Sequence, residues 1–282
     1  MSHTIAEAYH YCKKLTHQCG PHFSVGFRFL PREKREAVYA VYAFCRYADD
    51  IVDEQQQEPL EVLLKRWEVE LDGCYAQKPT HPITIALADA IQRYPIPKEG
   101  FLGLIEGCRM DLRLNRYQTF EELMVYCDRV ASTIRDLTLP VFGCRDPQGM
   151  AYGGALSTAL QLTNIVRDVG EDLDRDRIYL PLDEIKEAGY SEAELINRVK
   201  NKAFLRLMDF QCRRVRGYFD QAAKLIPLID KDARLALSLM RDVYVVLIDR
   251  IEARPYDVLD REIRLSWSAR GRVVISALLK GR

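Results

Sequence analysis

The chain has 282 residues, 48% of them hydrophobic, which is enough to bury a sizeable core. Its 41 basic residues balance 41 acidic ones, so no general affinity for nucleic acid is indicated. The sequence shows no leader, no apolar run long enough to span a membrane and no cysteine spacing typical of zinc or disulfide scaffolds, so we expect a cytoplasmic protein.

Apolar residues recur three and four positions apart along most of the chain, without the alternation typical of strands. This pattern predicts an all-α fold. In chain order, helices are expected at 3–17, 31–54, 58–76, 83–93, 98–114, 119–142, 147–174, 191–225, 229–252 and 267–279. No break between them has the composition of a flexible linker, so we predict one domain covering residues 1–282.

The helix expected at 31–54 ends with an unusual arrangement of charge. Its predicted inward-facing stripe consists of Val38, Val41, Tyr42, Cys45 and Val52. Asp49 and Asp53 continue this stripe four residues apart. Because a buried carboxylate is strongly disfavoured unless a positive charge compensates it, the pair indicates a bound cation.

The helix expected at 147–174 carries a second polar stripe. Gln161, Asn164, Asp168 and Asp172 follow one another at steps of three and four. Oxygen ligands of this kind suit Mg²⁺ or Mn²⁺, which takes one or two carboxylates and completes its shell with water and phosphate. Two such faces opposed across a cavity are predicted to bind a diphosphate. Either pair alone is more typical of a solvated helix face.

Basic and aromatic residues near these pairs fit the ionisation of an allylic diphosphate. The neighbouring bases are Arg46, Arg167, Arg175 and Arg177, which can neutralise a departing pyrophosphate. The aromatic candidates for the lining of a dry cavity around a carbocation are Phe23, Phe27, Phe29, Tyr39, Tyr42, Tyr126 and Tyr244. The arginines are also explained by surface ion pairing, and the aromatic residues by ordinary core packing.

Several long blocks resemble the squalene/phytoene synthase family over nearly the whole chain. They are Phe23-Ser-x-x-Phe-Arg-Phe-Leu-Pro31, Tyr42-Ala-Phe-Cys-Arg-Tyr-Ala-Asp-Asp-Ile-Val-Asp53, Met110-Asp-Leu, Tyr126-Cys-x-x-Val-Ala131, Leu162-Thr-Asn-Ile-Val-Arg-Asp-Val-Gly-Glu-Asp172 and Arg177-Ile-Tyr-Leu-Pro181. The resemblance implies a single-domain isoprenoid-synthase helical fold with a central cavity.

The resemblance also implies roles for individual residues. Asp49, Asp53, Asp168 and Asp172, with Asn164, would bind Mg²⁺ (or Mn²⁺) and the prenyl diphosphate substrates. Arg46, Asn164, Arg167, Arg177 and Tyr179 would bind the diphosphates, and Gln161, Tyr42 and Tyr244 would lie near the reacting carbons. Phe23 and Phe27, one helical turn apart, would shorten the cavity and slightly favour a C30 product.

Family members join two prenyl diphosphates head to head through a cyclopropylcarbinyl diphosphate. The product is squalene or hydroxysqualene (C30) from farnesyl diphosphate, or phytoene (C40) from geranylgeranyl diphosphate, and only squalene formation would require NADPH. The segment with Asp128, Ser132 and Arg135 departs from the common family pattern towards hydroxysqualene-forming members, and a more polar cavity there would favour capture of water. In contrast, Arg116-Tyr-Gln-Thr-Phe120 and Val169-Gly-Glu-Asp172 are more similar to phytoene synthases.

The sequence is also compatible with other functions. Residues 261–282 are basic and partly apolar, which is typical either of peripheral contact with the inner face of a membrane or of a helix packed on its own protein. A chain-elongating prenyltransferase or terpene cyclase shares opposed aspartate-rich helices but lacks the last two blocks above. A catalytically inactive binding factor would be expected to have lost its metal aspartates. The oligomeric state cannot be predicted.

Overall fold

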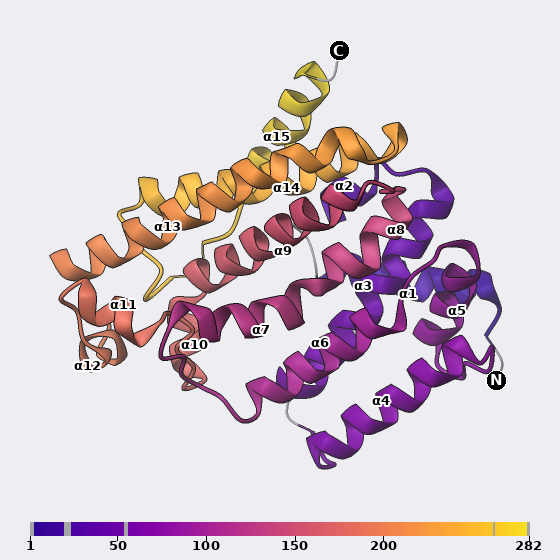
Figure 1. The fold of residues 1–282 in the computed structure, drawn as a ribbon, viewed down its shortest axis with the longest axis horizontal. Helices are drawn as coiled ribbons and strands as arrows, with labels where there is room; N and C mark the ends of the chain where they lie inside the picture. The colour runs from indigo at the N-terminus through magenta and orange to yellow at the C-terminus, as the bar shows by residue number, and fades with distance from the viewer. Residues whose placement is uncertain (1–2, 20–23, 54–55, 262, 281–282) are drawn as a thin grey trace.

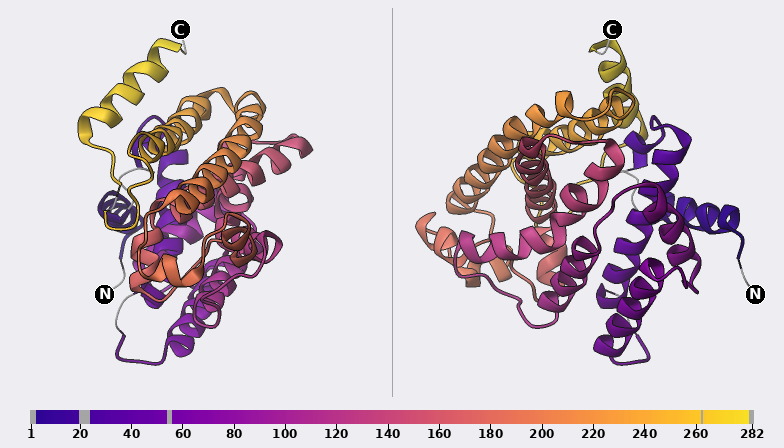
Figure 2. Two further views of the ribbon diagram at one scale, coloured as in Figure 1. Left: turned by 90° about the vertical axis from the view of Figure 1, so that its left-hand side faces the viewer. Right: turned by 45° about the vertical axis from the view of Figure 1, so that its right-hand side comes forward.

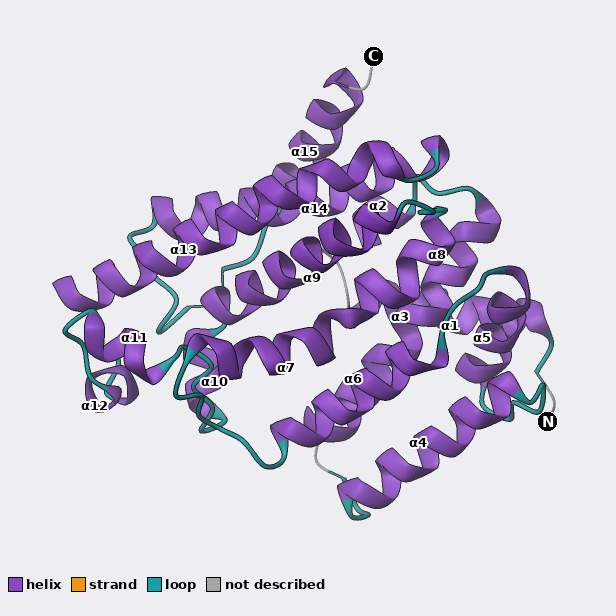
Figure 3. Cartoon of the chain, in the orientation of Figure 1, coloured by secondary structure: helices purple, strands orange, loops and turns teal. Residues whose placement is uncertain are grey.

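The computed structural model describes residues 3–19, 24–53, 56–261 and 263–280, and within these ranges it contains helices and no strand (Figures 1 and 3). The all-α prediction is therefore confirmed. The longer helices are α1 (Ile5–Cys19), α3 (Arg32–Asp53), α4 (Leu60–Tyr75), α5 (Pro82–Arg93), α6 (Lys98–Asp111), α7 (Phe120–Ser132), α9 (Pro147–Arg167), α13 (Lys202–Ala222), α14 (Lys231–Ala253) and α15 (Trp267–Lys280). The shorter ones are α2 (Ser24–Phe27), α8 (Leu139–Phe142), α10 (Val169–Asp174), α11 (Leu182–Glu187) and α12 (Glu192–Ile196).

Three of the predicted helices are interrupted. The segment at 119–142 contains a π-helical stretch, Thr133–Thr138, between α7 and α8. Pro140 follows this stretch and has no N–H for the carbonyl of the preceding turn, which favours an irregular ladder there. The segment at 147–174 breaks at Asp168, and the one at 191–225 breaks before Asn201, whose side chain caps α13. Helices α2 and α11 were not predicted because each is too short to show a period.

The helices surround a central space. Helix α1 packs on α3 and α5 at one side, α6 packs on α7, and α7 packs on α9. Helix α13 covers α9 on the opposite side, next to α14 (Figures 1 and 2). The buried hydrophobic residues form one continuous cluster in the described part of the chain, and the single domain over residues 1–282 stays a prediction. Side chains of α3, α6, α9 and α14 line one cavity inside this bundle.

The C-terminal helix α15 projects from the body in Figures 1 and 2 and packs against α14. One of its faces is buried and contains Ala269, Val273 and Ala277. The other face leaves Ile275 60% and Leu278 44% exposed. The helix is thus attached to its own protein, while membrane contact through residues 261–282 stays a prediction. Within the described ranges, no helix is sufficiently long and apolar to cross a membrane.

Candidate active site

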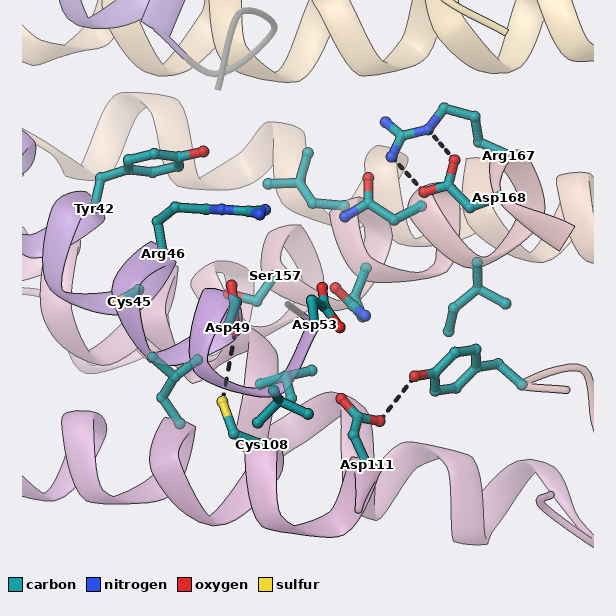
Figure 4. Close-up of a pocket in the computed structure, with 18 of the residues that line it drawn as sticks. Tyr42, Cys45, Arg46, Asp49, Asp53, Cys108, Asp111, Ser157, Arg167 and Asp168 are labelled. Atoms are coloured by element: carbon teal, nitrogen blue, oxygen red, sulfur yellow. Dashed lines mark hydrogen bonds and ion pairs between the residues drawn. The ribbon is translucent and has the colours of Figure 1, made fainter. Parts of the chain in front are cut away.

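The predicted inward stripe of α3 faces the cavity. Val38 and Val41 are fully buried, and the side chains of Tyr42, Cys45 and Val52 line the same cavity. Asp49 and Asp53 extend this lining towards the end of the helix (Figure 4). The apolar residues that bury the rest of α3 therefore also hold both carboxylates inside the protein.

The second polar stripe lies on α9 and α10. Gln161, Asn164, Asp168 and Asp172 all line the cavity. The helix is broken at Asp168, but the Asp172 N–H still donates to the Asp168 carbonyl at 2.8 Å, which keeps the two carboxylates on the same side. Figure 4 shows labelled side chains of α3 and α9 pointing into one space. The cavity has a volume of about 580 Å³, which is typical of a site for a small organic ligand.

The carboxylates differ in their partners. Arg167 donates to Asp168 from Nε at 2.6 Å, and Asp53 lies 3.4 Å from Arg175 and 3.3 Å from Arg177. Asp49 accepts only a weak hydrogen bond, from Cys108 Sγ at 3.6 Å, among the contacts that the structure describes. Two of the four carboxylates are thus paired with arginines, Asp168 with its neighbour in the chain and Asp53 with two arginines that follow α10.

Burial is the main influence on the other two carboxyl groups. It raises the pKa of Asp49 to about 7, with a smaller opposing effect of Arg46. It also raises the pKa of Asp172 to about 8, and the charge of Asp168 adds to that increase. Both groups are therefore costly to ionise without a further cation. The buried Asn164 Oδ1, which has no hydrogen-bond partner in the described structure, is a further uncompensated oxygen in this wall.

These donors fit Mg²⁺ better than a softer metal. The described residues contain no cluster of three or more histidine, cysteine or acidic side chains that could hold an ion alone. Mg²⁺ does not require such a cluster, since it usually takes one or two carboxylates and completes its shell with water and substrate phosphate. The two carboxylate pairs and Asn164 supply this kind of incomplete oxygen site.

The predicted basic and aromatic residues are largely brought together here. Arg46, Arg167, Arg177, Tyr179, Tyr244 and Phe27 line the cavity, together with Arg175 and Tyr126. Arg46 pairs with Asp50 through Nη2, while its buried Nε has no partner in the described structure. Tyr39 is buried in the core and Phe29 is 36% exposed, and neither lines the cavity, so these two aromatic predictions are wrong. Phe23 lies outside the described residues.

Asp111, at the end of α6, is a site residue to which the sequence analysis assigned no role. Tyr179 OH donates to its Oδ1 at 2.8 Å and Tyr126 OH to its Oδ2 at 3.1 Å. Burial raises the pKa of Asp111, and these hydrogen bonds and Arg177 oppose the increase. The ring of Tyr179 also stacks on Tyr126, with centroids 5.2 Å apart. The only signal in the sequence was the Met110-Asp-Leu block.

The C-terminal segment supplies two more bases that the sequence analysis missed. Arg264 and Arg270 line the cavity beside Tyr244. Arg270 is only 9% exposed, and its Nε donates to the Leu265 carbonyl at 3.1 Å. Their distance in sequence from the aspartate pairs left no local pattern that could have revealed them.

The expectation of a more polar cavity around Asp128 and Arg135 is wrong. Arg135 pairs with Asp128 at 2.9 Å and with Asp136 at 2.7 Å, and the Asp128 side chain is 64% exposed. Neither Asp128 nor Arg135 lines the cavity. The side chain of Ser132 lies outside the described part. A cluster of paired charges that does not line the cavity therefore gives no reason to expect water capture.

Comparison with known proteins shows the family to which this chain belongs. The squalene/phytoene synthase family profile matches residues 16–271. The 15-cis-phytoene synthase of Synechocystis sp. is 38% identical, over 92% of this chain and 80% of its own length, and the phytoene synthase of Arthrospira platensis is 37% identical, over 92% and 88%. The chain therefore belongs to the squalene/phytoene synthase family, whose members are prenyltransferases.

Solved structures show the same fold. A dehydrosqualene synthase superposes with a TM-score of 0.91 at 27% identity, covering 99% of this chain and 98% of that one. A squalene synthase of Alicyclobacillus acidocaldarius superposes with a TM-score of 0.83 at 31% identity, covering 89% and 95%. The predicted isoprenoid-synthase helical fold with a central cavity is confirmed.

Proposed function

We propose that this protein condenses two molecules of geranylgeranyl diphosphate head to head, through a cyclopropylcarbinyl diphosphate, to phytoene. The observation that carries the proposal is the pair of carboxylate stripes opposed across one cavity, in a chain 38% identical to a 15-cis-phytoene synthase. The slight preference for farnesyl diphosphate rested on Phe23 and Phe27. The names of the relatives favour the geranylgeranyl alternative, and formation of phytoene requires no NADPH.

The proposed roles follow the position of each side chain. Asp49, Asp53, Asp168 and Asp172, with Asn164, would hold Mg²⁺, and the arginines Arg46, Arg167 and Arg177 with Tyr179 would hold the diphosphates. Mg²⁺, when bound, neutralises diphosphate charge and so makes its departure easier. Arginines suit this task because their planar guanidinium groups bind phosphate oxygens in pairs.

The remaining wall protects the cationic chain. Tyr42, Gln161 and Tyr244 line the cavity from three different helices, and the reacting carbons would lie between them. Phe27 is 2% exposed and packs edge-on against Tyr39, with centroids 6.2 Å apart. An aromatic and apolar lining stabilises a carbocation and excludes bulk water.

The test is incubation of the purified protein with Mg²⁺ and labelled geranylgeranyl or farnesyl diphosphate, with and without NADPH, followed by identification of the extracted products. A C40 hydrocarbon formed from geranylgeranyl diphosphate without NADPH would support the proposal. A C30 product from farnesyl diphosphate would support the alternative, with NADPH separating squalene from hydroxysqualene. No coupled product from either substrate would support the inactive binding factor.

Variants complete the test. Asp49→Asn and Asp168→Asn are expected to abolish turnover while the far-ultraviolet circular dichroism spectrum stays that of the wild type, because each removes one carboxylate of an opposed pair. Substantial turnover in both variants would contradict the assignment of the metal residues.

A further inference from the structure

Ser157 presents an uncompensated hydroxyl group to the cavity. It lies on α9, four residues before Gln161, and so continues the polar stripe of that helix by one turn. Its side chain is 4% exposed and lines the cavity (Figure 4). Within the described structure, its Oγ has no hydrogen-bond partner. No motif in the sequence had indicated this residue.

Two other buried hydroxyl groups in helices behave differently. Thr163, on the same helix, donates from Oγ1 to the Ala159 carbonyl at 2.6 Å, and Thr16 on α1 donates to the Cys12 carbonyl at 2.8 Å. This bond to the carbonyl four residues earlier is the usual solution for a buried helical serine or threonine. A hydroxyl left without any partner costs about 1–3 kcal/mol. The orientation of Ser157 therefore points to a polar ligand in the cavity.

The distance along α9 restricts what that ligand can be. Asp168 is eleven residues from Ser157, which at 1.5 Å per residue is about 16 Å along the helix axis. A diphosphate bound at Asp168 and Asp172 is too short to reach Ser157. Leu160, three residues after Ser157 on the same helix, also lines the cavity, as do Leu104 and Val130, so the hydrocarbon chains would lie beside Ser157. A prenyl chain has no hydrogen-bonding atom, which leaves water as the partner.

We propose that Ser157 holds a water molecule beside the prenyl chains, and that this water accepts the proton lost in the last step. This inference rests on the proposed function. The final C40 cation loses a proton from carbon, the electron pair of the broken C–H bond forms the central double bond, and the water becomes hydronium, which gives its proton to bulk water when the product leaves. The same water could instead add to the cation and give an alcohol, so its position makes Ser157 a specificity-determining residue.

The first experiment compares Ser157→Ala with Thr163→Val in single turnovers of the full chain with Mg²⁺ and geranylgeranyl diphosphate. Thr163→Val is the matched control. Thr163 lies on the same helix as Ser157, and the buried hydroxyl that the substitution removes does not line the cavity. In Ser157→Ala, the cyclopropylcarbinyl diphosphate is expected to form at the wild-type rate. The yield of phytoene relative to this intermediate should fall by about a hundredfold or more, the range of a lost proton acceptor. Thr163→Val should keep the wild-type ratio.

The second experiment locates the water directly. A crystal structure of the wild type with Mg²⁺ and the unreactive geranylgeranyl thiodiphosphate should show a water within about 3.2 Å of Ser157 Oγ, and Ser157→Ala should lack it. Ser157→Gly serves as a second variant if the alanine protein is unstable. An unchanged product ratio in a folded variant, or no water at Ser157 in the wild-type complex, would overturn the inference. Failure of the wild type to form any C40 product would instead overturn the proposed function.

Discussion

Replacing Asp49 with asparagine is expected to stabilise the metal-free protein although it should abolish turnover. Burial raises the pKa of Asp49 from 3.8 to about 7, and the two values differ by about three pKa units. One unit corresponds to about 1.4 kcal/mol, so the ionised carboxylate lowers the free energy of unfolding by up to about 4 kcal/mol. Water that enters the cavity screens part of this cost, and we expect a gain of about 1–3 kcal/mol.

The dependence of the free energy of unfolding on pH shows whether the Asp49 carboxylate stabilises or destabilises the protein. Because the folded-state pKa is raised, the folded protein binds the proton more tightly than the unfolded chain does. The stability of the wild type should therefore fall as pH rises from about 4 to about 7 and then change no further through this group. Asp49→Asn has no carboxyl group here and should lack this part of the pH dependence.

The assay is urea unfolding, followed by circular dichroism, at pH 5 and pH 8 in the presence of a chelator. Asp128→Asn is the control, because the Asp128 side chain is 64% exposed. At pH 8, Asp49→Asn should unfold at a higher urea concentration than the wild type, whereas Asp128→Asn should not. A lower midpoint for Asp49→Asn would show that the carboxylate is compensated within the protein, and it would remove the main argument for a bound cation.

Three further predictions concern the support of the site. Gly170→Ala should lower both the melting temperature and kcat, because a Cβ would lie 2.1 Å from the Leu259 carbonyl oxygen and push α10 out of place; a wild-type kcat would contradict this. Glu184→Ala should lower the free energy of unfolding by about 3 kcal/mol, measured in urea, because it leaves the half-buried Arg214 without its carboxylate; a loss below about 1 kcal/mol would contradict this. Burial lowers the pKa of His81, whose Nδ1 accepts a hydrogen bond at the start of α5. The stability that neutral His81 contributes is therefore complete above pH 6.5 and should be lost as pH falls below that value. The melting temperature of His81→Asn should fall less over this range than that of the wild type, and an equal fall would exclude His81 as the source.

The sequence identified site residues where a helical repeat of apolar residues and a pair of carboxylates lie on the same face of one helix. On α3, the apolar stripe of Val38 and Val41 and the carboxylates of Asp49 and Asp53 follow one helical pattern, and the structure places all four at the cavity. The same argument succeeded for Asn164 on α9. Each of these residues could be found because helix geometry alone relates it to its neighbours.

The remainder of the site depends on contacts between distant segments. Asp111 and Arg264 reach the cavity only because α6 and the C-terminal segment pack against the bundle, and no local period reports such packing. Arg135, in contrast, was wrongly expected at the cavity, because a departure from a family pattern indicated a polar lining there. In the folded chain its guanidinium pairs with Asp128 and Asp136 instead. The interruption before Pro140 also turns this segment relative to an ideal helix.

The cavity wall extends from Gln18 on the first helix to Arg270 on the last. A ribosome releases these residues in order, so the nascent chain cannot close the wall until the segment around Arg270 has left the exit tunnel. The aspartate pairs are made much earlier, so the cavity around them is enclosed only when the C-terminal segment packs against the bundle. Closure of the site therefore depends on contacts that span nearly the whole chain.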